Sequence, residues 1–444
     1  MSFIEPVDAE LSNQLLSALA VRGVAHSRAL QAALGRSQPT VSRLLAGLSS
    51  KLLVLGTGKR TRYALPMGIL GLPAQQPLRA VHEDGRVEDW GRLSFLQGQR
   101  VHVQAPGVDL LVQGQLPWFL SPLRGEGFIG RLRARELAAW GLPADPAQWT
   151  LEQTLFAALH TPDAPGALQL GEDLPAGAAT QAATQAATPG TPATGPDWDA
   201  LADATTQLGP AGSSAGGEQA KFLTRDAQGQ ALLVKFSPPR PSPFGTRWHD
   251  LLHAEALALA VLGEHGVEVA QTHVVESARR TFLVSRRFDR HGLHGRSHVV
   301  PLHAVHDAFV PGPRQHWAAT CAALAQQRRL PAEAAAQARA LLHFGRLIGN
   351  TDMHFGNLSL RVAWPDLVRG RFTLAPLYDM LPMRWRPDVH SGELGPLPFT
   401  PDPADLQSAA RPVALIFWQR CARSPAISSE FKALAATMVQ RLQG

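Results

Sequence analysis

The sequence predicts an α+β protein that begins with a winged helix-turn-helix, continues with a small α+β subdomain, and ends in a two-lobed core whose second lobe is mainly helical. Two observations predict this class. A helix-and-hairpin pattern fills the first 66 residues, and beyond residue 198 strand-like segments come first and alanine-rich helical segments follow. Composition and pattern place the boundaries at 1–66, 67–172, 173–197, 198–285 and 286–444.

The overall composition is globular. The 444 residues suffice for two or three domains, and 45% apolar with 18% charged residues can form a sizeable core. The two cysteines, Cys321 and Cys421, lie far apart and match no metal-binding spacing, which fits a reducing compartment. No segment has the length or composition of a membrane span or a signal peptide. We therefore expect a cytoplasmic protein that does not bind membranes.

The N-terminal unit is expected to contain three short helices. Ser27 is expected to cap the second helix, which ends at Gly35, and Pro39 stands in the first turn of the third helix, where its missing N–H costs nothing. Two short strands should then flank the turn at Gly56-Thr57-Gly58. This order of elements is typical of a winged helix-turn-helix.

Charge and side-chain pattern indicate that this unit binds double-stranded DNA. Residues 1–65 carry eight lysines and arginines against three acidic residues, whereas the net charge of the whole chain is only +6. The third helix would enter the major groove, and the hairpin would contact phosphates as a wing. The expected DNA-binding residues are Gln38, Thr40, Ser42, Arg43, Lys59, Arg60 and Arg62. A small helical dimerisation module is the alternative, and a homodimer that reads two half-sites is also expected.

The next two segments show no recognisable chemistry. Within 67–172 we expect strands at 86–95, 100–103 and 110–112 and a helix at 130–140. Residues 173–197 are dominated by alanine, threonine, glycine and proline, so they cannot bury a core and are expected to form a disordered linker.

The segment from Gly349 to Leu360 carries the strongest chemical signal. It places Asp352 and Asn357 five positions apart, and Asp379 follows in an apolar setting. Protein kinases use this arrangement: the first aspartate orients or deprotonates the acceptor hydroxyl, while the asparagine and the later aspartate bind Mg²⁺ on the nucleotide phosphates. A polar turn between strands is the alternative for either segment alone. Together they predict phosphoryl transfer in a protein-kinase-like core.

Lys235 lies in the apolar strand 231–236, where a lysine needs a counter-charge. Kinases use a lysine on such a strand to hold the nucleotide phosphates. Only five of the 42 basic residues are lysines, so a lysine at this position indicates that a compact point charge is needed. Glu255 on the following helix is a candidate partner. The alternatives are a water-facing lysine on an edge strand and a glutamate on a helix surface.

A Gly/Ser loop at 212–222 contains Ser213 and Ser214 and precedes a strand. Its small residues would let backbone N–H groups approach phosphates, and one serine could itself be phosphorylated. The loop matches neither common glycine-rich nucleotide motif, so a flexible loop is equally compatible. Near the site, we expect His354 to hold the loop shape, Tyr378 to pack beside the metal ligands, and Asp289 to pair with a neighbouring arginine.

This ordered set of motifs resembles the HipA family of serine/threonine kinases, the toxin half of bacterial toxin–antitoxin pairs. The matching segments are 213–216, 234–236, 253–255, 287–290, 350–357 and 375–379, and the resemblance covers about residues 66–444. A winged helix fused in front is similar to the YjjJ-like subgroup, whereas the ordinary toxin works with a separate DNA-binding antitoxin.

The resemblance implies a HipA-like kinase fold that uses ATP and Mg²⁺ and acts on a protein substrate that the sequence does not identify. It implies that Lys235 contacts the ATP phosphates, that Asp352 is catalytic, and that Asn357 and Asp379 bind the magnesium. It also implies that Ser213 or Ser214 is autophosphorylated and thereby silences the kinase. Because the serine loop is one residue longer than the family pattern, the resemblance does not identify which serine is modified.

Two other functions fit parts of the sequence. Aminoglycoside- and choline-type phosphotransferases share the Asp-x-x-x-x-Asn loop, although here Asn350-Thr351 stands where those enzymes usually have His-Gly. A transcription regulator whose inactive kinase core only senses nucleotide is the second alternative. The intact set of Lys235, Asp352 and Asp379 argues against a decayed site. Neither the DNA operator nor a toxic effect follows from the sequence alone.

Overall fold

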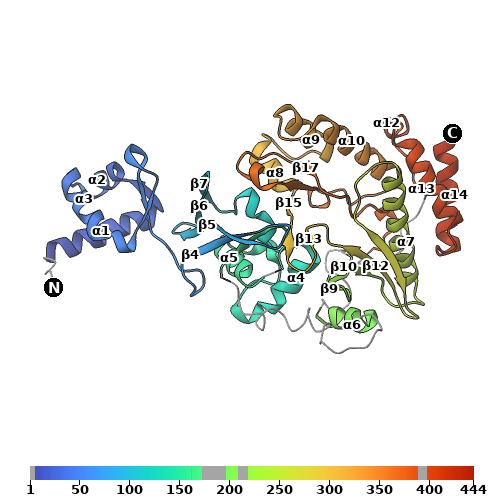
Figure 1. The fold of residues 1–444 in the computed structure, drawn as a ribbon, viewed down its shortest axis with the longest axis horizontal. Helices are drawn as coiled ribbons and strands as arrows, with labels where there is room; N and C mark the ends of the chain where they lie inside the picture. The colour runs from blue at the N-terminus through green and yellow to red at the C-terminus, as the bar shows by residue number, and fades with distance from the viewer. Residues whose placement is uncertain (1–5, 162, 173–196, 209–218, 389–397) are drawn as a thin grey trace.

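The structure is a computed structural model that describes residues 6–161, 163–172, 197–208, 219–388 and 398–444. The N-terminal unit lies at one end of an elongated molecule, and helices α13 and α14 lie at the other (Figure 1). The loop with Ser213 and Ser214, and nearly all of the expected linker, lie outside the described residues. Among the described helices, none is both long and apolar enough to cross a membrane.

Between Pro6 and Ala64 the chain forms three α-helices and an antiparallel sheet in the order β1-β3-β2. The elements are α1 (Pro6–Arg22), β1 (Val24–His26), α2 (Ser27–Leu34), α3 (Gln38–Gly47), β2 (Leu53–Leu55) and β3 (Arg62–Ala64), with 3₁₀ turns at Ser49–Lys51 and Gly58–Arg60. Leu15, Leu30 and Val41 come from the three helices and are completely buried, so this unit has a core of its own.

The predicted helices and hairpin of this unit are present, with two differences. Ser27 does not cap α2: it is the first helical residue, His26 occupies the cap position, and the Ser27 hydroxyl accepts a hydrogen bond from Gln31 instead. The short strand β1 was not predicted, because three residues are too few to show an alternating pattern. Gly35 ends α2 in the left-handed conformation, with φ of 62°, as its position predicts.

The described residues between 75 and 170 form a second unit around an antiparallel sheet in the order β7-β6-β5-β4-β8. Its elements are β4 (Gln75–Val81), β5 (Val87–Leu96), β6 (Arg100–Ala105), β7 (Val108–Gln113), α4 (Gly127–Glu136), α5 (Leu151–Leu159) and β8 (Leu168–Leu170), with 3₁₀ turns at Trp118–Leu123, Ala138–Trp140 and Pro146–Gln148. Strands β5 to β7 and helix α4 agree with prediction. Strand β8 joins β4 from the far end of the unit, a pairing that no local pattern reveals.

The third unit is an antiparallel sheet in the order β11-β12-β10-β9, with a helix on each face. Its described elements are α6 (Trp198–Leu208), β9 (Lys221–Arg225), β10 (Ala231–Phe236), α7 (Pro243–Glu264), β11 (Thr272–Glu276) and β12 (Thr281–Arg286). Leu232, Val234 and Phe236 face α6, whereas Lys235 points to the opposite face, toward α7. Helix α7, on which Glu255 was expected, begins at Pro243, because Ser242 caps it and Pro243 opens it.

The remainder of the chain is mainly helical, as predicted. Its described helices are α8 (Leu302–Phe309), α9 (Trp317–Gln326), α10 (Ala332–Leu347), α11 (Trp364–Leu367), α12 (Pro403–Leu406), α13 (Arg411–Arg423) and α14 (Ser429–Gln443). Short strands complete it: β13 (Arg290–His291), β14 (Gly295–Arg296), β15 (His298–Pro301), β16 (Ser359–Val362) and β17 (Thr373–Leu374), with 3₁₀ turns at Phe355–Asn357 and Met383–Trp385.

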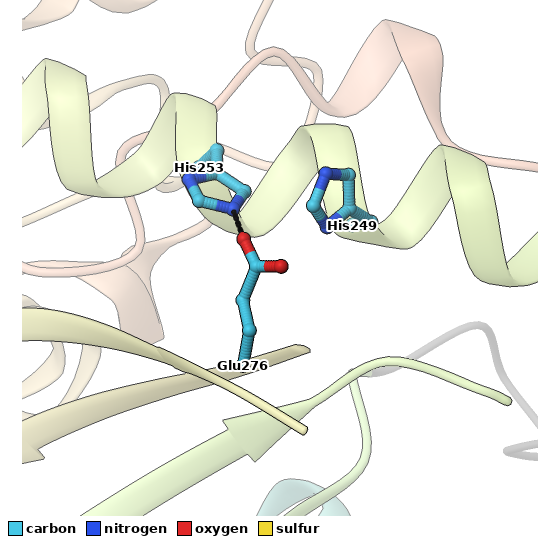
Figure 2. Close-up of side chains that lie close together, drawn as sticks. All are labelled: His249, His253 and Glu276. Carbon is cyan, nitrogen blue, oxygen red and sulfur yellow. Dashed lines mark hydrogen bonds and ion pairs between the residues drawn. The ribbon is translucent and has the colours of Figure 1, made fainter. Parts of the chain in front are cut away.

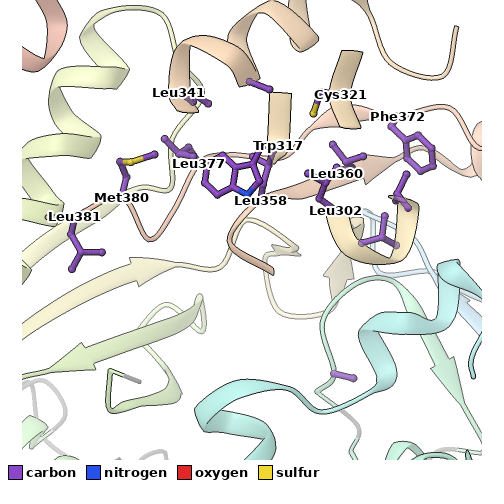
Figure 3. Close-up of a cluster of buried hydrophobic side chains, with 14 of the residues drawn as sticks. Leu302, Trp317, Cys321, Leu341, Leu358, Leu360, Phe372, Leu377, Met380 and Leu381 are labelled. Atoms are coloured by element: carbon purple, nitrogen blue, oxygen red, sulfur yellow. The ribbon is translucent and has the colours of Figure 1, made fainter. Parts of the chain in front are cut away.

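One hydrophobic core runs from the second unit into the helical lobe and supports the segments with the strongest chemical signal. Figure 3 shows part of this core, including Trp317, Leu358, Leu377 and Met380. Leu358 directly follows Asn357, and Leu377 and Met380 lie on either side of Asp379. The Trp317 indole N–H donates a hydrogen bond of 3.0 Å to the His354 carbonyl oxygen. Buried side chains therefore fix the backbone from which the polar groups project.

Trp317→Phe tests this support. The smaller ring removes the indole hydrogen bond to the His354 carbonyl oxygen, which keeps its second bond from the Asn357 N–H, so we expect the free energy of unfolding to fall by about 0.5–1.5 kcal/mol. The urea midpoint of the purified full-length protein measures this. Trp140→Phe is the matched control, because Trp140 is 61% exposed and should leave the midpoint unchanged. Equal midpoints for the two variants would contradict the supporting role of Trp317.

Candidate functional site

Lys235, Glu255 and Asp379 form a buried charge cluster between the sheet and the helical lobe. The Lys235 ammonium group donates to both carboxylate oxygens of Glu255, at 2.6 and 2.7 Å, and it also donates to the Asp379 carboxylate. An ammonium group has three N–H donors, so these bonds satisfy all of them. Lys235 is 5% exposed and Glu255 is 2% exposed. The two alternatives considered above, a water-facing lysine and a surface glutamate, are therefore wrong.

The electrostatics of this cluster favour the charged forms of Lys235 and Asp379. Burial by itself would lower the pKa of Lys235, but the Asp379 and Glu255 carboxylates outweigh burial and raise it. Burial by itself would raise the pKa of Asp379, but the positive charges of Lys235 and Lys221 lower it to about 2. Burial raises the pKa of Glu255, and Lys235 opposes that rise. The three groups are stable as ions only while they remain together.

Lys221 is a further positive charge that was not predicted for the site. On the antiparallel pair β9–β10 it lies directly opposite Lys235, so both lysines project from the same face of the sheet. Like charges at facing positions repel, and here the two carboxylates offset that repulsion. The sequence held a signal for Lys221: lysine is scarce in this chain, and a strand was expected directly after the Gly/Ser loop.

Asp352 and Asn357 lie on the loop that follows α10. The Asn357 side-chain amide donates to the Asp352 carbonyl oxygen at 2.8 Å, which closes the six-residue loop. The Asn350 side-chain oxygen accepts from the Asp352 backbone N–H at 3.0 Å. His354 Nδ1 accepts from the Gly356 N–H at 3.0 Å, so this histidine caps the 3₁₀ turn, in agreement with its predicted structural role.

Two side chains connect this loop to the segment that carries Asp379. The Asn350 amide donates to the Asp379 carbonyl oxygen at 3.3 Å. The Tyr378 hydroxyl donates to the Gly356 carbonyl oxygen at 2.8 Å and accepts from Ser359 at 2.7 Å. Burial raises the pKa of Tyr378, so the hydroxyl keeps its proton. Asp379 itself has φ of 54°, a conformation rare for residues other than glycine, and these bonds help to hold it. The sequence did not indicate these connections.

The donor atoms around the site suit a hard cation and its phosphate ligands. The side-chain nitrogen of Asn357 is engaged within the loop, so its carboxamide oxygen is the side-chain atom that can serve as a metal ligand. Together with the Asp379 carboxylate this offers the oxygen ligands that Mg²⁺ prefers. The residues present therefore fit a magnesium–nucleotide complex, with Asn357 and Asp379 to hold the ion and the lysines to face phosphate.

A second buried ion network joins the second unit to the kinase-like core. Asp289 pairs with Arg287 at 3.0 Å and with Arg290 at 2.7 Å, and Asp163 of the second unit pairs with the same two arginines at 2.6 and 2.8 Å. Burial by itself would raise the pKa of Asp289, but the two guanidinium groups outweigh it and lower the pKa. The predicted pairing of Asp289 with neighbouring arginines is confirmed, whereas Asp163 was not predicted.

The predicted residues thus fall into two groups. The structure brings Lys235, Glu255 and Asp379 into contact and places Asp352 and Asn357 on a loop tied to Asp379. The predicted DNA-binding residues lie in the N-terminal unit, on α3 and around the β2–β3 hairpin: Gln38, Thr40, Ser42, Arg43, Lys59, Arg60 and Arg62. Ser213 and Ser214 lie outside the described residues.

Comparison with protein families matches most of the chain. Residues 213–442 match the HipA-like C-terminal domain, and residues 72–177 match the middle domain of YjjJ-like toxins. Toxin YjjJ of Escherichia coli strain K12 is 34% identical over 455 aligned positions, which cover 96% of this chain and 97% of that protein.

One solved structure shows the same fold, and a second is a weaker match. The HipA–HipB–operator DNA complex of the Shewanella oneidensis MR-1 toxin–antitoxin system contains a chain that matches with a TM-score of 0.52 and 16% identity, covering 83% of this chain and 95% of that chain. The proinflammatory kinase CtkA of Helicobacter pylori matches with a TM-score of 0.34 and 14% identity, covering 53% of this chain and 91% of its own.

Lys235→Met tests the buried charge cluster. The variant leaves two carboxylates facing each other without their cation, so we expect thermal stability at pH 8 to fall by about 3 kcal/mol. The pKa values of Glu255 and Asp379 should then rise, because their mutual repulsion favours a bound proton. A carboxyl group whose pKa is higher in the folded than in the unfolded protein stabilises the folded state at low pH. The loss of stability in Lys235→Met, relative to the parent protein, should therefore be smaller at pH 5.5 than at pH 8.

Thermal unfolding of both proteins at the two pH values measures this effect. Lys51→Met is the control, because Lys51 is exposed and its removal should cost little at either pH. A deficit for Lys235→Met that is the same at pH 8 and pH 5.5 would contradict the coupling of the three charges.

Proposed function

The chain belongs to the HipA family and, within it, to the YjjJ-like toxins, and on this basis we propose that it is an ATP- and Mg²⁺-dependent serine/threonine protein kinase fused to its own DNA-binding domain. The observation that supports the kinase activity most strongly is the Lys235–Glu255–Asp379 cluster beside the Asp352–Asn357 loop. Each member has the charge and the neighbours that phosphoryl transfer requires.

In the proposed reaction the acceptor hydroxyl oxygen attacks the γ-phosphorus of ATP. The new P–O bond forms as the bond between the γ-phosphorus and the bridging oxygen breaks, ADP leaves, and the hydroxyl proton passes to the Asp352 carboxylate. The Asn350 side chain orients Asp352 through its backbone N–H, at 3.0 Å. Holding acceptor and base in a fixed geometry removes much of the entropic barrier to the transfer.

Lys235 would bind phosphate oxygens, and Glu255 would hold the lysine in place. When bound, Mg²⁺ would neutralise phosphate charge between Asn357 and Asp379. Because Lys235 contacts Asp379 directly, nucleotide entry would exchange one of the lysine's carboxylate partners for phosphate oxygens. Glu255 would remain as the partner that prevents an unpaired buried cation.

We also propose that Ser213 or Ser214 is the autophosphorylation site. The loop immediately precedes β9, whose Lys221 faces the same side of the sheet as Lys235. A phosphorylated serine adds about −1.5 to −2 charge, which the lysines would attract, so the modified loop would compete with nucleotide.

Asp352→Asn should abolish phosphoryl transfer. Incubation of the parent protein with γ-labelled ATP and Mg²⁺ is expected to label Ser213 or Ser214, as located by mass spectrometry. The asparagine cannot accept the hydroxyl proton, so we expect label incorporation to fall by at least about 100-fold. Asp366→Asn is the control, because Asp366 lies on α11 and forms only a surface pair with Arg369, at 3.8 Å.

The outcomes separate the alternative functions. Undiminished labelling in Asp352→Asn would overturn the kinase proposal. Transfer to an added aminoglycoside or choline without protein labelling would favour a small-molecule phosphotransferase. Tight ATP binding without turnover in the parent protein would favour a nucleotide-sensing regulator. A phosphoproteome comparison of cells with the parent and the Asp352→Asn protein would identify the substrate.

For the N-terminal unit we propose a winged helix-turn-helix that binds double-stranded DNA. On α3, Val41 and Leu44 are buried while Gln38, Ser42 and Arg43 are exposed, so the helix presents a polar face. Lys59 and Arg60 are exposed on the turn between β2 and β3. The structural relative with a TM-score of 0.52 was solved with HipB and operator DNA. A homodimer would place two such units on two half-sites.

Replacing both Lys59 and Arg60 by glutamine should weaken DNA binding and its dependence on salt. Each phosphate contact contributes about 0.9 to the slope of log K against log salt, so we expect the slope to fall by about 1.8. Fluorescence anisotropy with a labelled 30-base-pair duplex, from 50 to 200 mM salt, measures it. The control replaces Arg339 and Lys432 of the helical lobe, which should leave the slope unchanged. An unchanged slope in the Lys59/Arg60 variant would remove the hairpin from the DNA interface.

A further inference from the structure

Away from the proposed kinase site, two histidines and a glutamate converge where α7 meets β11. His249 and His253 are one helical turn apart on α7, and Glu276 ends β11 (Figure 2). One ligand atom from each of the three side chains lies within 4.8 Å of the other two. His253 Nε2 and Glu276 Oε1 are 2.9 Å apart. Among the described residues, His249, His253 and Glu276 are the set of histidine, cysteine or acidic side chains that lie close enough together to bind one metal ion.

The surroundings of His249 match those of a metal ligand. Its Nε2 lies 2.6 Å from the Ala426 carbonyl oxygen. A carbonyl oxygen only accepts, so Nε2 carries the proton, and in the neutral ring Nδ1 presents the lone pair. Histidine ligands of metals usually donate their second ring N–H to such a carbonyl, which fixes the tautomer and the ring orientation. Nδ1 now accepts from the Thr281 hydroxyl at 2.7 Å, a bond that an ion would displace.

We propose that His249 Nδ1, His253 Nε2 and Glu276 Oε1 bind one divalent transition-metal ion of the zinc class. The proton with which His253 Nε2 now donates to Glu276 Oε1 moves to Nδ1 of the same ring or to solvent when the ion binds. Two imidazole nitrogens and a carboxylate oxygen suit Zn²⁺ better than Mg²⁺ or Ca²⁺, which prefer all-oxygen sites. Zn²⁺ bonds of about 2.0–2.1 Å require ligand atoms about 3.3 Å apart, so the site must contract on binding. Glu276 has a side chain that is 42% exposed, so it can make that movement and leaves a path for the ion.

Arg240 affects the metal affinity that we expect for this site. Its guanidinium nitrogens lie 3.5 Å from Glu276 Oε2 and 3.5 Å from His249 Nδ1. The positive charge opposes a cation, while the bond to Oε2 leaves Oε1 for ligation. Replacing Arg240 by glutamine removes the charge and keeps a donor for Oε2, so it should tighten metal binding. A site elsewhere in the chain would not respond to this change.

A metal ion at this position would affect how α7 is held in the fold. His253 is two residues before Glu255, the carboxylate that holds Lys235. An ion would tie this part of α7 to β11 on one side and, through His249 and Ala426, to the segment between α13 and α14 on the other. Occupancy would therefore stabilise the placement of α7 against the sheet, and the apparent stability of the protein should rise with metal concentration.

The test is a titration of the full-length protein with Co²⁺ as a spectroscopic probe and with Zn²⁺ in competition. Excess Mg²⁺ in the buffer occupies oxygen-rich sites. We expect one Co²⁺ per chain with visible absorption bands of a four- or five-coordinate ion, full displacement by Zn²⁺, and a rise of the thermal midpoint with Zn²⁺. His253→Gln and Glu276→Gln should each weaken binding by at least about 100-fold, beyond the 10- to 100-fold typical of outer-shell changes.

His273→Gln is the matched control, since His273 is an exposed histidine on the same strand β11. It should bind with the parent affinity. The exposed Glu276→Gln change should leave the fold intact, which keeps the test valid if His253→Gln is unstable. Binding that is absent, that survives both ligand changes, or that falls equally in His273→Gln would overturn the proposal. An Arg240→Gln variant that binds no more tightly than the parent would count against this location.

Discussion

The buried Lys235 ammonium group is the constraint on which the arrangement of the core depends. A cation that is 5% exposed is tolerable only when all of its protons are bound and its charge is balanced. The two balancing carboxylates come from α7 and from the segment after β17, which are far apart in sequence. The hydrogen bonds and charge balance of Lys235 therefore hold both α7 and the helical lobe against the sheet. In the proposed function, the same groups engage the nucleotide and its metal.

A second constraint acts on the backbone rather than on charge. The Asp352–Asn357 loop has little regular structure, and it is fixed by connections to its surroundings. Trp317 holds the His354 carbonyl, Asn350 holds the Asp352 N–H and the Asp379 carbonyl, and the apolar residues that follow the loop lie in the large core. Apolar anchoring beneath a polar loop lets the site carry an unusual backbone conformation, such as that of Asp379, without losing its shape.

Sequence patterns predicted the features of this fold that are formed by residues close together in the sequence. The alanine-rich segments that follow the strands were predicted to be helical, and α9 and α10 are such helices, packed against the continuous core. The Asp-x-x-x-x-Asn spacing predicted the loop because its closure lies within six residues. Features that depend on distant partners were missed. Asp163 reaches Arg287, and β8 pairs with β4 across the second unit. Sequence separation removes any local signal for such contacts.

The junction between the N-terminal unit and the rest of the chain limits how the two can communicate. Leu55 and Ala64 of the small sheet pack with Leu96 of β5, and backbone bonds join Met67 to Phe95 and Gln97 to Leu65. This contact combines apolar packing with backbone hydrogen bonds, and it involves the end of β5 that is furthest from the Asp163–Arg287 network. The second unit shares its core with the helical lobe and is bound to it by that ion network. Among the described residues, the N-terminal unit is therefore held to the sheet of the second unit by these contacts rather than tethered by a free linker.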